Sequence, residues 1–285
     1  MTIGHYFLIL LIMALFGSAF VLGKLVLNTN VPPLLFGSLR MLVVLICLVP
    51  FFKFQFPKKK YLKSLIVFSL SMGVGVTAFT YLSLEESSIV SPVIIGSQLA
   101  IPFAIILSTI FLNESINLKK WFFVISSFVG IVLIGFDPNL INNIFALVLT
   151  AGMSLFYAVA NVSSRNINKI DVVTTNTFMA FAGFVVLIIL SIFIEGETVG
   201  ILKNIDLKIW FLIVYSGLVV SVGAHMSLFY LYKFYPVGKV LPFYSLFPVF
   251  GLIQSFIVFR EIPSLMVTLG GIIVIGSVFI LQKIK

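Results

Sequence analysis

Long apolar runs alternate with short polar connections along almost the whole chain. A membrane-spanning helix needs roughly 20 apolar residues, and ten runs reach about that length. The runs lack the alternating pattern of barrel strands, so only helices can satisfy their backbone groups in lipid. The pattern predicts an all-α integral membrane protein with ten transmembrane helices. We place these helices at residues 4–26, 32–52, 62–83, 88–112, 118–136, 141–163, 173–194, 207–231, 236–259 and 263–282.

The composition supports a bilayer as the solvent of this chain. Hydrophobic residues make up 61% of the 285 residues and charged residues 9%, whereas soluble proteins carry roughly 25% charged residues. The first apolar run has no basic leader and is longer than the apolar part of a signal peptide, so we expect it to be retained. A lone cysteine and two distant histidines give no metal-binding spacing, and neither a metal nor a cofactor is expected.

Lysine and arginine gather on one side of the predicted topology. With the N-terminus inside, thirteen basic residues fall at inner ends, four fall at outer ends, and Arg40 lies within a span. Cytoplasmic loops carry the excess of basic residues, so we expect a multi-pass protein of the cell inner (cytoplasmic) membrane with both termini cytoplasmic. This asymmetry and contact with anionic lipid account for the net charge of +9, and no nucleic-acid partner is expected.

The second half of the chain repeats a phrase of the first half. The stretch "FLNESINLKKWFFVISSFVGIVLIG" around Glu114 has a counterpart in "FREIPSLMVTLGGIIVIGSVFIL" around Glu261. A repeated unit of five spans is odd in number, so its second copy enters the membrane from the opposite side. We therefore expect two inverted five-helix repeats, residues 1–137 and 138–285.

Prolines lie inside the fourth and ninth predicted spans, which correspond to each other in the two halves. They are Pro92 and Pro102 in the fourth span and Pro242 and Pro248 in the ninth. Interrupted segments at corresponding positions indicate where a secondary transporter binds its substrate.

The stretches from Pro102 to Glu114 and from Pro248 to Glu261, each followed by a glycine-rich span, resemble the EamA family of the drug/metabolite transporter superfamily. The resemblance covers essentially the whole chain. It implies a ten-span inner-membrane transporter of amino acids or other small metabolites. Phe247 stands where many relatives carry a glutamate, so a mechanism that needs a carboxylate at this position is not expected.

Polar side chains inside spans are candidates for a substrate site, because polar groups are costly in lipid. Tyr157 and Asn161 share a helical face, as do Ser221 and His225. We expect one central, nearly uncharged substrate-binding cavity. Each polar group could instead join packed helices, at about 0.6 kcal/mol per bond, and Arg40 could be structural rather than a clamp for a carboxylate. The candidates are Arg40, Tyr81, Gln98, Tyr157, Asn161, His225 and Tyr244.

All nine acidic residues fall at span ends or in connections. Acidic relays are typical of proton pumps, so we expect any proton coupling at the central site to use His225, whose side chain ordinarily titrates near neutral pH. The alternative is a carboxylate at a rim, Glu114 or Glu261. Facilitated exchange stays open.

These patterns predict a secondary transporter that exports amino acids or similar small metabolites by alternating access. Its expected partners are a small-molecule substrate and the lipid bilayer, and it would act as a monomer or a homodimer. The alternatives are a facilitative or proton-coupled importer of another small metabolite, or a channel, although the rings of charge of a channel are not visible. An enzyme is not expected, because no set of nucleophile, base or metal ligands occurs.

Overall fold

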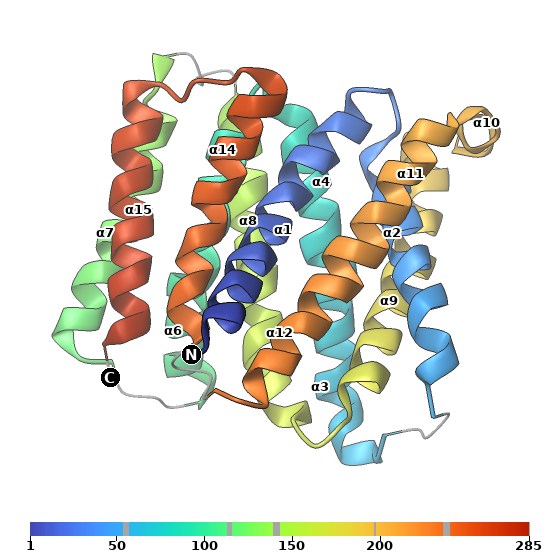
Figure 1. Ribbon diagram of the computed structural model, residues 1–285, viewed down its shortest axis with the longest axis horizontal. Helices are drawn as coiled ribbons and strands as arrows, with labels where there is room; N and C mark the ends of the chain where they lie inside the picture. The colour runs from blue at the N-terminus through green and yellow to red at the C-terminus, as the bar shows by residue number, and fades with distance from the viewer. Residues whose placement is uncertain (54–56, 113–115, 139–142, 197, 236–239, 285) are drawn as a thin grey trace.

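All regular secondary structure in the described part of the computed structural model is helical. The structure describes residues 1–285 except 54–56, 113–115, 139–142, 197, 236–239 and 285. Within these residues, nine helical rods are long and apolar enough to cross a membrane, and a shorter apolar helix covers Phe243–Phe259. The chain is therefore an all-helical membrane protein, in which the helices run side by side (Figure 1).

The helices of the first half are α1 (Ile3–Leu27), α2 (Pro33–Leu48), α3 (Lys59–Ser69), α4 (Thr77–Glu86), α5 (Ser91–Gly96), α6 (Ala100–Leu112) and α7 (Leu118–Gly135). Those of the second half are α8 (Ile144–Ser164), α9 (Val172–Leu190), α10 (Thr198–Asn204), α11 (Leu207–Tyr215), α12 (Ala224–Tyr232), α14 (Phe247–Phe259) and α15 (Leu265–Lys283).

Irregular helical turns interrupt the rods at corresponding places in the two halves. The π-helical segments η2 (Leu70–Val76) and η7 (Ser216–Gly223) join α3 to α4 and α11 to α12. The 3₁₀ segments η3 (Ser97–Leu99) and η8 (Leu241–Leu246) precede α6 and α14. Other short segments are η1 (Val49–Phe51), η5 (Arg165–Ile167) and η6 (Ser191–Glu195). Mid-rod breaks of this kind often mark functional sites.

The span expected at 236–259 differs from a single α-helix in the described residues. Residues 236–239 lie outside the described part, residues 241–246 are 3₁₀-helical, and the α-helix begins at Phe247. Proline has no amide donor and is tolerated in a first helical turn. Pro248 accordingly lies at the start of α14, and Pro92 lies at the start of α5. These prolines begin helices rather than bend them in the middle.

The two halves of the chain are interleaved rather than separate. Close packing pairs α1 with α14, α6 with α8, α2 with α9, and α7 with α15. The α7–α15 pair stands at one side of the molecule, and α2 and α9 lie toward the other (Figure 1). Helix α1 approaches α14 closely at Gly17, where a β-carbon would lie 2.6 Å from the Gly251 nitrogen and 2.8 Å from the Phe247 oxygen. Glycine is required there because only backbone faces it.

One face of the molecule collects capped helix ends, and we call it the capped face. It carries the ends of α1, α4 and α14 and the starts of α2, α5 and α8. The ammonium of Lys24 donates to the carbonyl oxygens of Leu84 and Ser87, each at 2.8 Å. Asn143, just before α8, donates to the Ser88 hydroxyl at 2.8 Å. Helix α1 therefore ends on the face where α8 begins, and the two helices run in opposite directions.

Two carboxylates cap helices on this face. Glu195 accepts from the backbone nitrogens of Leu34 and Leu35 at 2.6 and 3.0 Å, at the start of α2. Glu261 accepts from the nitrogens of Val90 and Ser91 at 2.9 and 2.8 Å, at the start of α5. These first-turn nitrogens have no partner within their own helices, so each glutamate ties two distant parts of the chain together. Glu114 lies outside the described residues.

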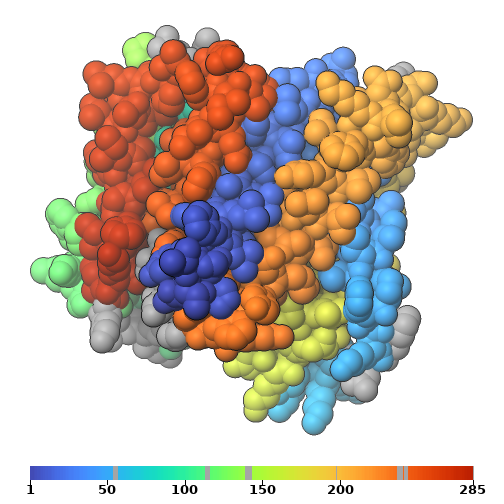
Figure 2. Space-filling model, in the orientation of Figure 1, coloured from blue at the N-terminus to red at the C-terminus, as the bar shows by residue number. Residues whose placement is uncertain are grey.

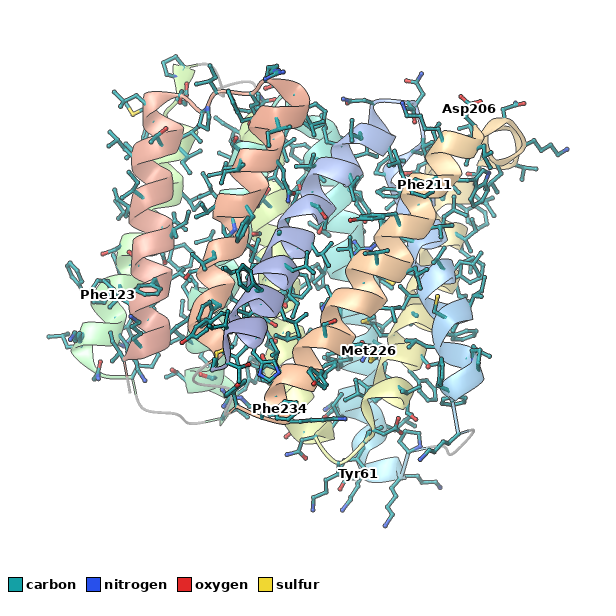
Figure 3. The ribbon with its side chains drawn as sticks, in the orientation of Figure 1. Tyr61, Phe123, Asp206, Phe211, Met226 and Phe234 are labelled. Carbon is teal, nitrogen blue, oxygen red and sulfur yellow. The ribbon has the colours of Figure 1, made fainter. Side chains whose placement is uncertain are left out.

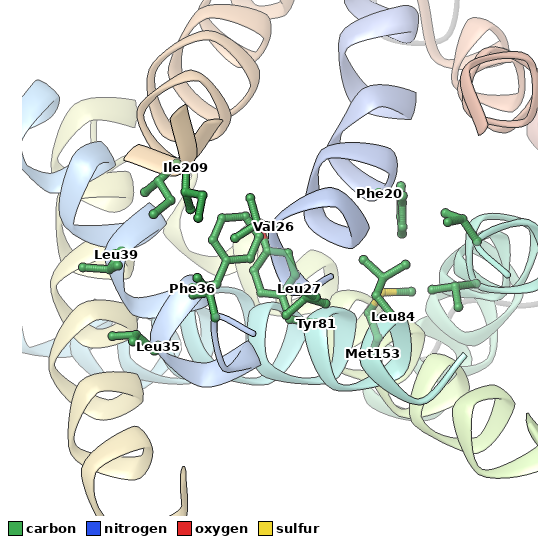
Figure 4. Packing of buried hydrophobic residues seen from close by; sticks show 14 of the residues in the cluster. Phe20, Val26, Leu27, Leu35, Phe36, Leu39, Tyr81, Leu84, Met153 and Ile209 are labelled. Carbon is green, nitrogen blue, oxygen red and sulfur yellow. The ribbon is translucent and has the colours of Figure 1, made fainter. Parts of the chain in front are cut away.

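A buried apolar cluster fills the molecule beneath the capped face (Figure 4). It includes Phe20, Leu27, Phe36, Tyr81 and Leu84, which come from α1, α2 and α4. Phe36 and Tyr81 pack with ring centroids 4.3 Å apart. Seen from the front, α1, α14 and the α11–α12 rod cover the interior (Figure 2). The cluster therefore closes the centre of the molecule from the capped face.

Candidate functional site

A cavity of about 520 Å³ lies on the other side of the apolar cluster. Its walls come from α2, the α3–η2–α4 rod, α8, α9, the η7–α12 rod and η8. It extends from Arg40 to the residues between α8 and α9, such as the exposed Asn168. We call the side of the molecule on which it opens the open face. Met226 of α12 and Tyr61 of α3 lie toward this side, and Asp206 and Phe211 lie toward the capped face (Figure 3).

The cavity wall combines hydrogen-bonding groups with aromatic and aliphatic side chains. Among the described residues, no Asp or Glu lines it, and Arg40 is its one permanently charged side chain. The polar lining residues are Arg40, Thr77, Thr80, Tyr157, Asn161, Ser164, Asn168, Thr175, Asn176, Ser221, His225, Tyr232 and Tyr244.

Both sides of the Arg40 guanidinium are held by other helices. Its Nε donates to the Ser221 hydroxyl at 2.9 Å, and its Nη1 donates to the Tyr81 hydroxyl at 2.6 Å. Tyr81 itself is only 1% exposed and belongs to the buried apolar cluster. It therefore supports Arg40 from behind and is not part of the cavity lining.

His225 lies at the inner part of the cavity, beside Ser221. Its Nδ1 lies 2.8 Å from the Ser221 carbonyl oxygen. A carbonyl oxygen can only accept, so Nδ1 carries the proton of this bond, and in a neutral ring Nε2 is an acceptor. The His225 ring packs on Phe16 of α1 with centroids 4.8 Å apart, and Phe16 in turn contacts Tyr244.

Tyrosines and an asparagine extend the site toward the open face. Tyr157, Tyr244 and the exposed Asn161 line the cavity. Tyr232 lines the cavity as well. Sequence reasoning missed Tyr232, although it follows His225 by seven residues and so falls on the same helical face. It also missed Asn168, which lies in a connection that carries no periodic signal.

Five of the seven sequence candidates come together in this cavity: Arg40, Tyr157, Asn161, His225 and Tyr244. Tyr81 reaches it only through Arg40. Gln98 does not line it; the side chain is 2% exposed, and its amide nitrogen has no partner among the described groups. Among the described residues, no three His, Cys, Asp or Glu side chains gather to hold a metal ion.

Asp171 lies between the cavity mouth and the start of α9. Its carboxylate accepts from the Thr174 nitrogen at 2.9 Å and caps the helix. Partial burial raises the pKa of this carboxyl, but the hydrogen bonds from Thr174 and the charge of Lys53 outweigh burial, so the pKa lies below its ordinary value. The connection at the mouth therefore keeps a negative charge at neutral pH.

In a comparison with known protein families, one family model matches each half of the chain. The model of the EamA-like transporter family matches residues 4–136 and 144–282. "Uncharacterized transporter YoaV" of Bacillus subtilis (strain 168) is 24% identical over 264 residues, which are 88% of this chain and 87% of that protein. "Uncharacterized transporter YdfC" of the same organism is 26% identical over 180 residues, which are 62% of this chain and 57% of that protein.

A solved structure described as "Crystal structure of protein" is similar with a TM-score of 0.60 and 15% sequence identity. The similarity covers 94% of this chain and 96% of that one. It indicates that the two chains share a fold over nearly all of their length.

Proposed function

The chain belongs to the EamA-like transporter family, and on this premise we propose that it exports amino acids or similar small metabolites by alternating access. Membership confirms the resemblance read from the sequence and makes the chain a multi-pass membrane transporter rather than an enzyme. The substrate class, the direction and the access mechanism are the parts that we propose.

The cavity that ends at Arg40 is the observation that carries this proposal. It opens on one face and stops at mid-molecule, where the buried cluster around Phe36, Tyr81 and Leu84 separates it from the capped face. A channel would offer a path through the molecule, whereas an alternating-access transporter exposes its site to one side at a time. The volume and the polar, aromatic wall suit a small solute that forms several hydrogen bonds.

We propose that residues 1–137 and 138–285 are inverted repeats and that the apolar helix Phe243–Phe259 completes ten crossings. Three observations support this arrangement. Each family match falls in one half, α2 packs on α9 and α7 packs on α15, and α1 ends on the face where α8 begins. Alternating access would then exchange the roles of the two halves about the site at Arg40.

We also propose that the open face is cytoplasmic and that both termini lie in the cytoplasm. Lys59, Lys60, Arg165 and Lys169 belong to the segments at this end of the molecule. Basic residues are retained on the cytoplasmic side of membrane proteins. On this assignment the cavity takes up its solute from inside the cell, which is the orientation that export requires.

The proposal is tested by uptake of a panel of radiolabelled amino acids into proteoliposomes. We expect saturable uptake that unlabelled solute competes away. Asn161→Ala, in the cavity wall, should reduce it several-fold with little change in the folded amount. Asn204→Ala, on the exposed α10, is the matched control and should transport like wild type. Uptake that never saturates would favour a channel, and an unaffected Asn161→Ala would remove the cavity from the pathway.

A further inference from the structure

We infer that Arg40, Ser221 and His225 form a built binding site for the carboxylate end of the substrate. The substrate class is a small carboxylic acid with a hydrogen-bond donor next to the carboxylate, which describes both α-amino acids and α-hydroxy acids. This inference rests on the proposed transport function and adds where and how the solute is held.

The charge of Arg40 gives the first reason. A guanidinium has five N–H donors, and the bonds to Ser221 and Tyr81 use one on Nε and one on Nη1. The remaining N–H groups have no acceptor within the described part of the chain. No acidic side chain of the described cavity wall neutralises the charge. Arg40 is half-buried and faces the cavity. A partly desolvated charge gains from a partner, and a carboxylate matches the planar fork of an arginine in two parallel hydrogen bonds.

The second reason is that the guanidinium is fixed before any ligand arrives. Tyr81 cannot swing away, because it is 1% exposed and packs against Phe36. Ser221 is fixed as well, since its hydroxyl donates to the Ser216 carbonyl oxygen at 2.9 Å and so accepts from Arg40. This hydrogen bond joins residues five positions apart, and both residues belong to the π-helical segment η7. Donors fixed in this way bind an anion without losing much conformational freedom.

The third reason is that Ser221 holds His225 beside Arg40. The Ser221 hydroxyl binds Arg40 and the Ser221 carbonyl binds His225 Nδ1. Both side chains line the same cavity. Arg40 therefore offers donors, and Nε2 of a neutral His225 offers an acceptor in the same cavity wall. A solute that carries an ammonium or hydroxyl group beside its carboxylate satisfies both. An amide keeps one accepting oxygen but loses the charge and the second acceptor, and a simple amine loses the arginine contact altogether.

The test measures binding of matched acids and amides to the purified full-length protein by calorimetry. The probes are L-leucine and L-leucinamide, 2-hydroxy-4-methylpentanoate and its amide, and 4-methylpentanoate and its amide. We expect each acid that carries the neighbouring donor to bind at least tenfold more tightly than its amide, and 4-methylpentanoate to bind more weakly than the two donor-bearing acids. The ammonium and hydroxyl series then show which donor His225 accepts.

Variants connect this discrimination to the three residues. Arg40→Gln should bring the acid-to-amide ratio close to one, and Arg40→Lys should keep part of the ratio because the charge remains but the fork is lost. Ser221→Ala should lower the ratio several-fold by releasing Arg40, because it removes the hydroxyl that holds the guanidinium and leaves the carbonyl that binds His225. Asn204→Ala should leave the ratio unchanged. A melting curve for each variant separates loss of fold from loss of discrimination, since a merely structural arginine would alter stability and not the ratio.

The outcomes separate this site from the proposed function. Equal binding of acids and amides, a ratio that survives Arg40→Gln, or no binding of any of the three acids overturns the carboxylate site, even if transport of other solutes is found. Arg40-dependent binding of 4-methylpentanoate without binding of L-leucine upholds the carboxylate site and contradicts both amino-acid export and the neighbouring-donor requirement.

Discussion

Single buried or half-buried polar residues connect helices that lie far apart in the sequence. Ser221 forms hydrogen bonds with both Arg40 and His225, and Glu261, which follows α14, accepts hydrogen bonds from the start of α5. Each of these groups satisfies backbone or charged partners that would otherwise lose their hydrogen bonds on leaving water. Their substitution is therefore expected to act on the contact between helices rather than on one helix alone.

Glu261 gives a prediction at this scale. Its carboxylate is 8% exposed and accepts from the Val90 and Ser91 nitrogens and from the hydroxyls of Ser91 and Ser255. Glu261→Gln replaces one accepting oxygen by a donor that faces other donors, and should cost about 1–3 kcal/mol of stability. Thermal unfolding in detergent measures this cost. Glu86→Gln, at the exposed end of α4, is the control and should melt like wild type; equal melting of both variants would mean that the cap is dispensable.

His225 gives a second prediction. Apart from Arg40 and the tyrosines, His225 is the titratable side chain among the described residues of the cavity wall, and its ordinary pKa lies near neutrality. We expect that an imposed pH gradient drives solute accumulation in proteoliposomes of wild type and not of His225→Gln, which keeps hydrogen bonding but cannot be protonated. Equal accumulation by both proteins would assign His225 to positioning alone.

At the scale of elements, close packing of α1 on α14 depends on a missing side chain. A methyl group at Gly17 would collide with backbone atoms of Gly251 and Phe247, which cannot move aside as a side chain can. Gly17→Ala should therefore lower the melting temperature markedly, although alanine is the better helix former. Gly276→Ala in α15 meets nothing within 4 Å and should be neutral or slightly stabilising. Equal melting temperatures would show that the α1–α14 contact is looser than described.

The sequence alone predicts some of these elements and not others. Apolar runs of 20 residues predict rods because lipid leaves the backbone no other choice. Within the described residues, nine long rods lie where the sequence placed them, and a shorter apolar helix falls within the tenth predicted span. The segments η2 and η7 carry no comparable signal, because a π-helical turn shifts backbone hydrogen bonds by one residue and leaves the apolar composition unaltered. The proline signal in the fourth and ninth spans correctly indicated interruptions, but not that α14 begins only at Phe247.

The site was predictable to a similar degree. Tyr157 and Asn161 share a helical face, so their joint appearance in the cavity follows from periodicity. Gln98 and Tyr81 passed the same test of being polar and within a span, yet Gln98 is buried away from the cavity and Tyr81 lies behind Arg40. Which face of a rod turns toward the cavity is decided by packing against other helices, and a single sequence does not contain that information.

For the whole molecule, sidedness is the property that connects structure to transport direction. In a Cys47→Ala background, we expect Lys59→Cys to react with a membrane-impermeant thiol reagent only from the cytoplasmic side, and Asn204→Cys only from outside. The two positions lie at opposite ends of the molecule, since Lys59 begins α3 and Asn204 ends α10, just before α11. Strong labelling of Lys59→Cys from outside would reverse the topology and make the cavity outward-facing.

The central claim is that the cavity at Arg40 is one face of an alternating-access site, and counterflow tests it most directly. Proteoliposomes are loaded with a high concentration of the unlabelled amino acid that competes best in the uptake panel, and a trace of the same amino acid is added outside with a radioactive label. Exchange through one alternating site should give a transient overshoot of label inside, which Asn161→Ala diminishes and Asn204→Ala preserves. Label that merely equilibrates, with no overshoot at any loading concentration, would contradict alternating access.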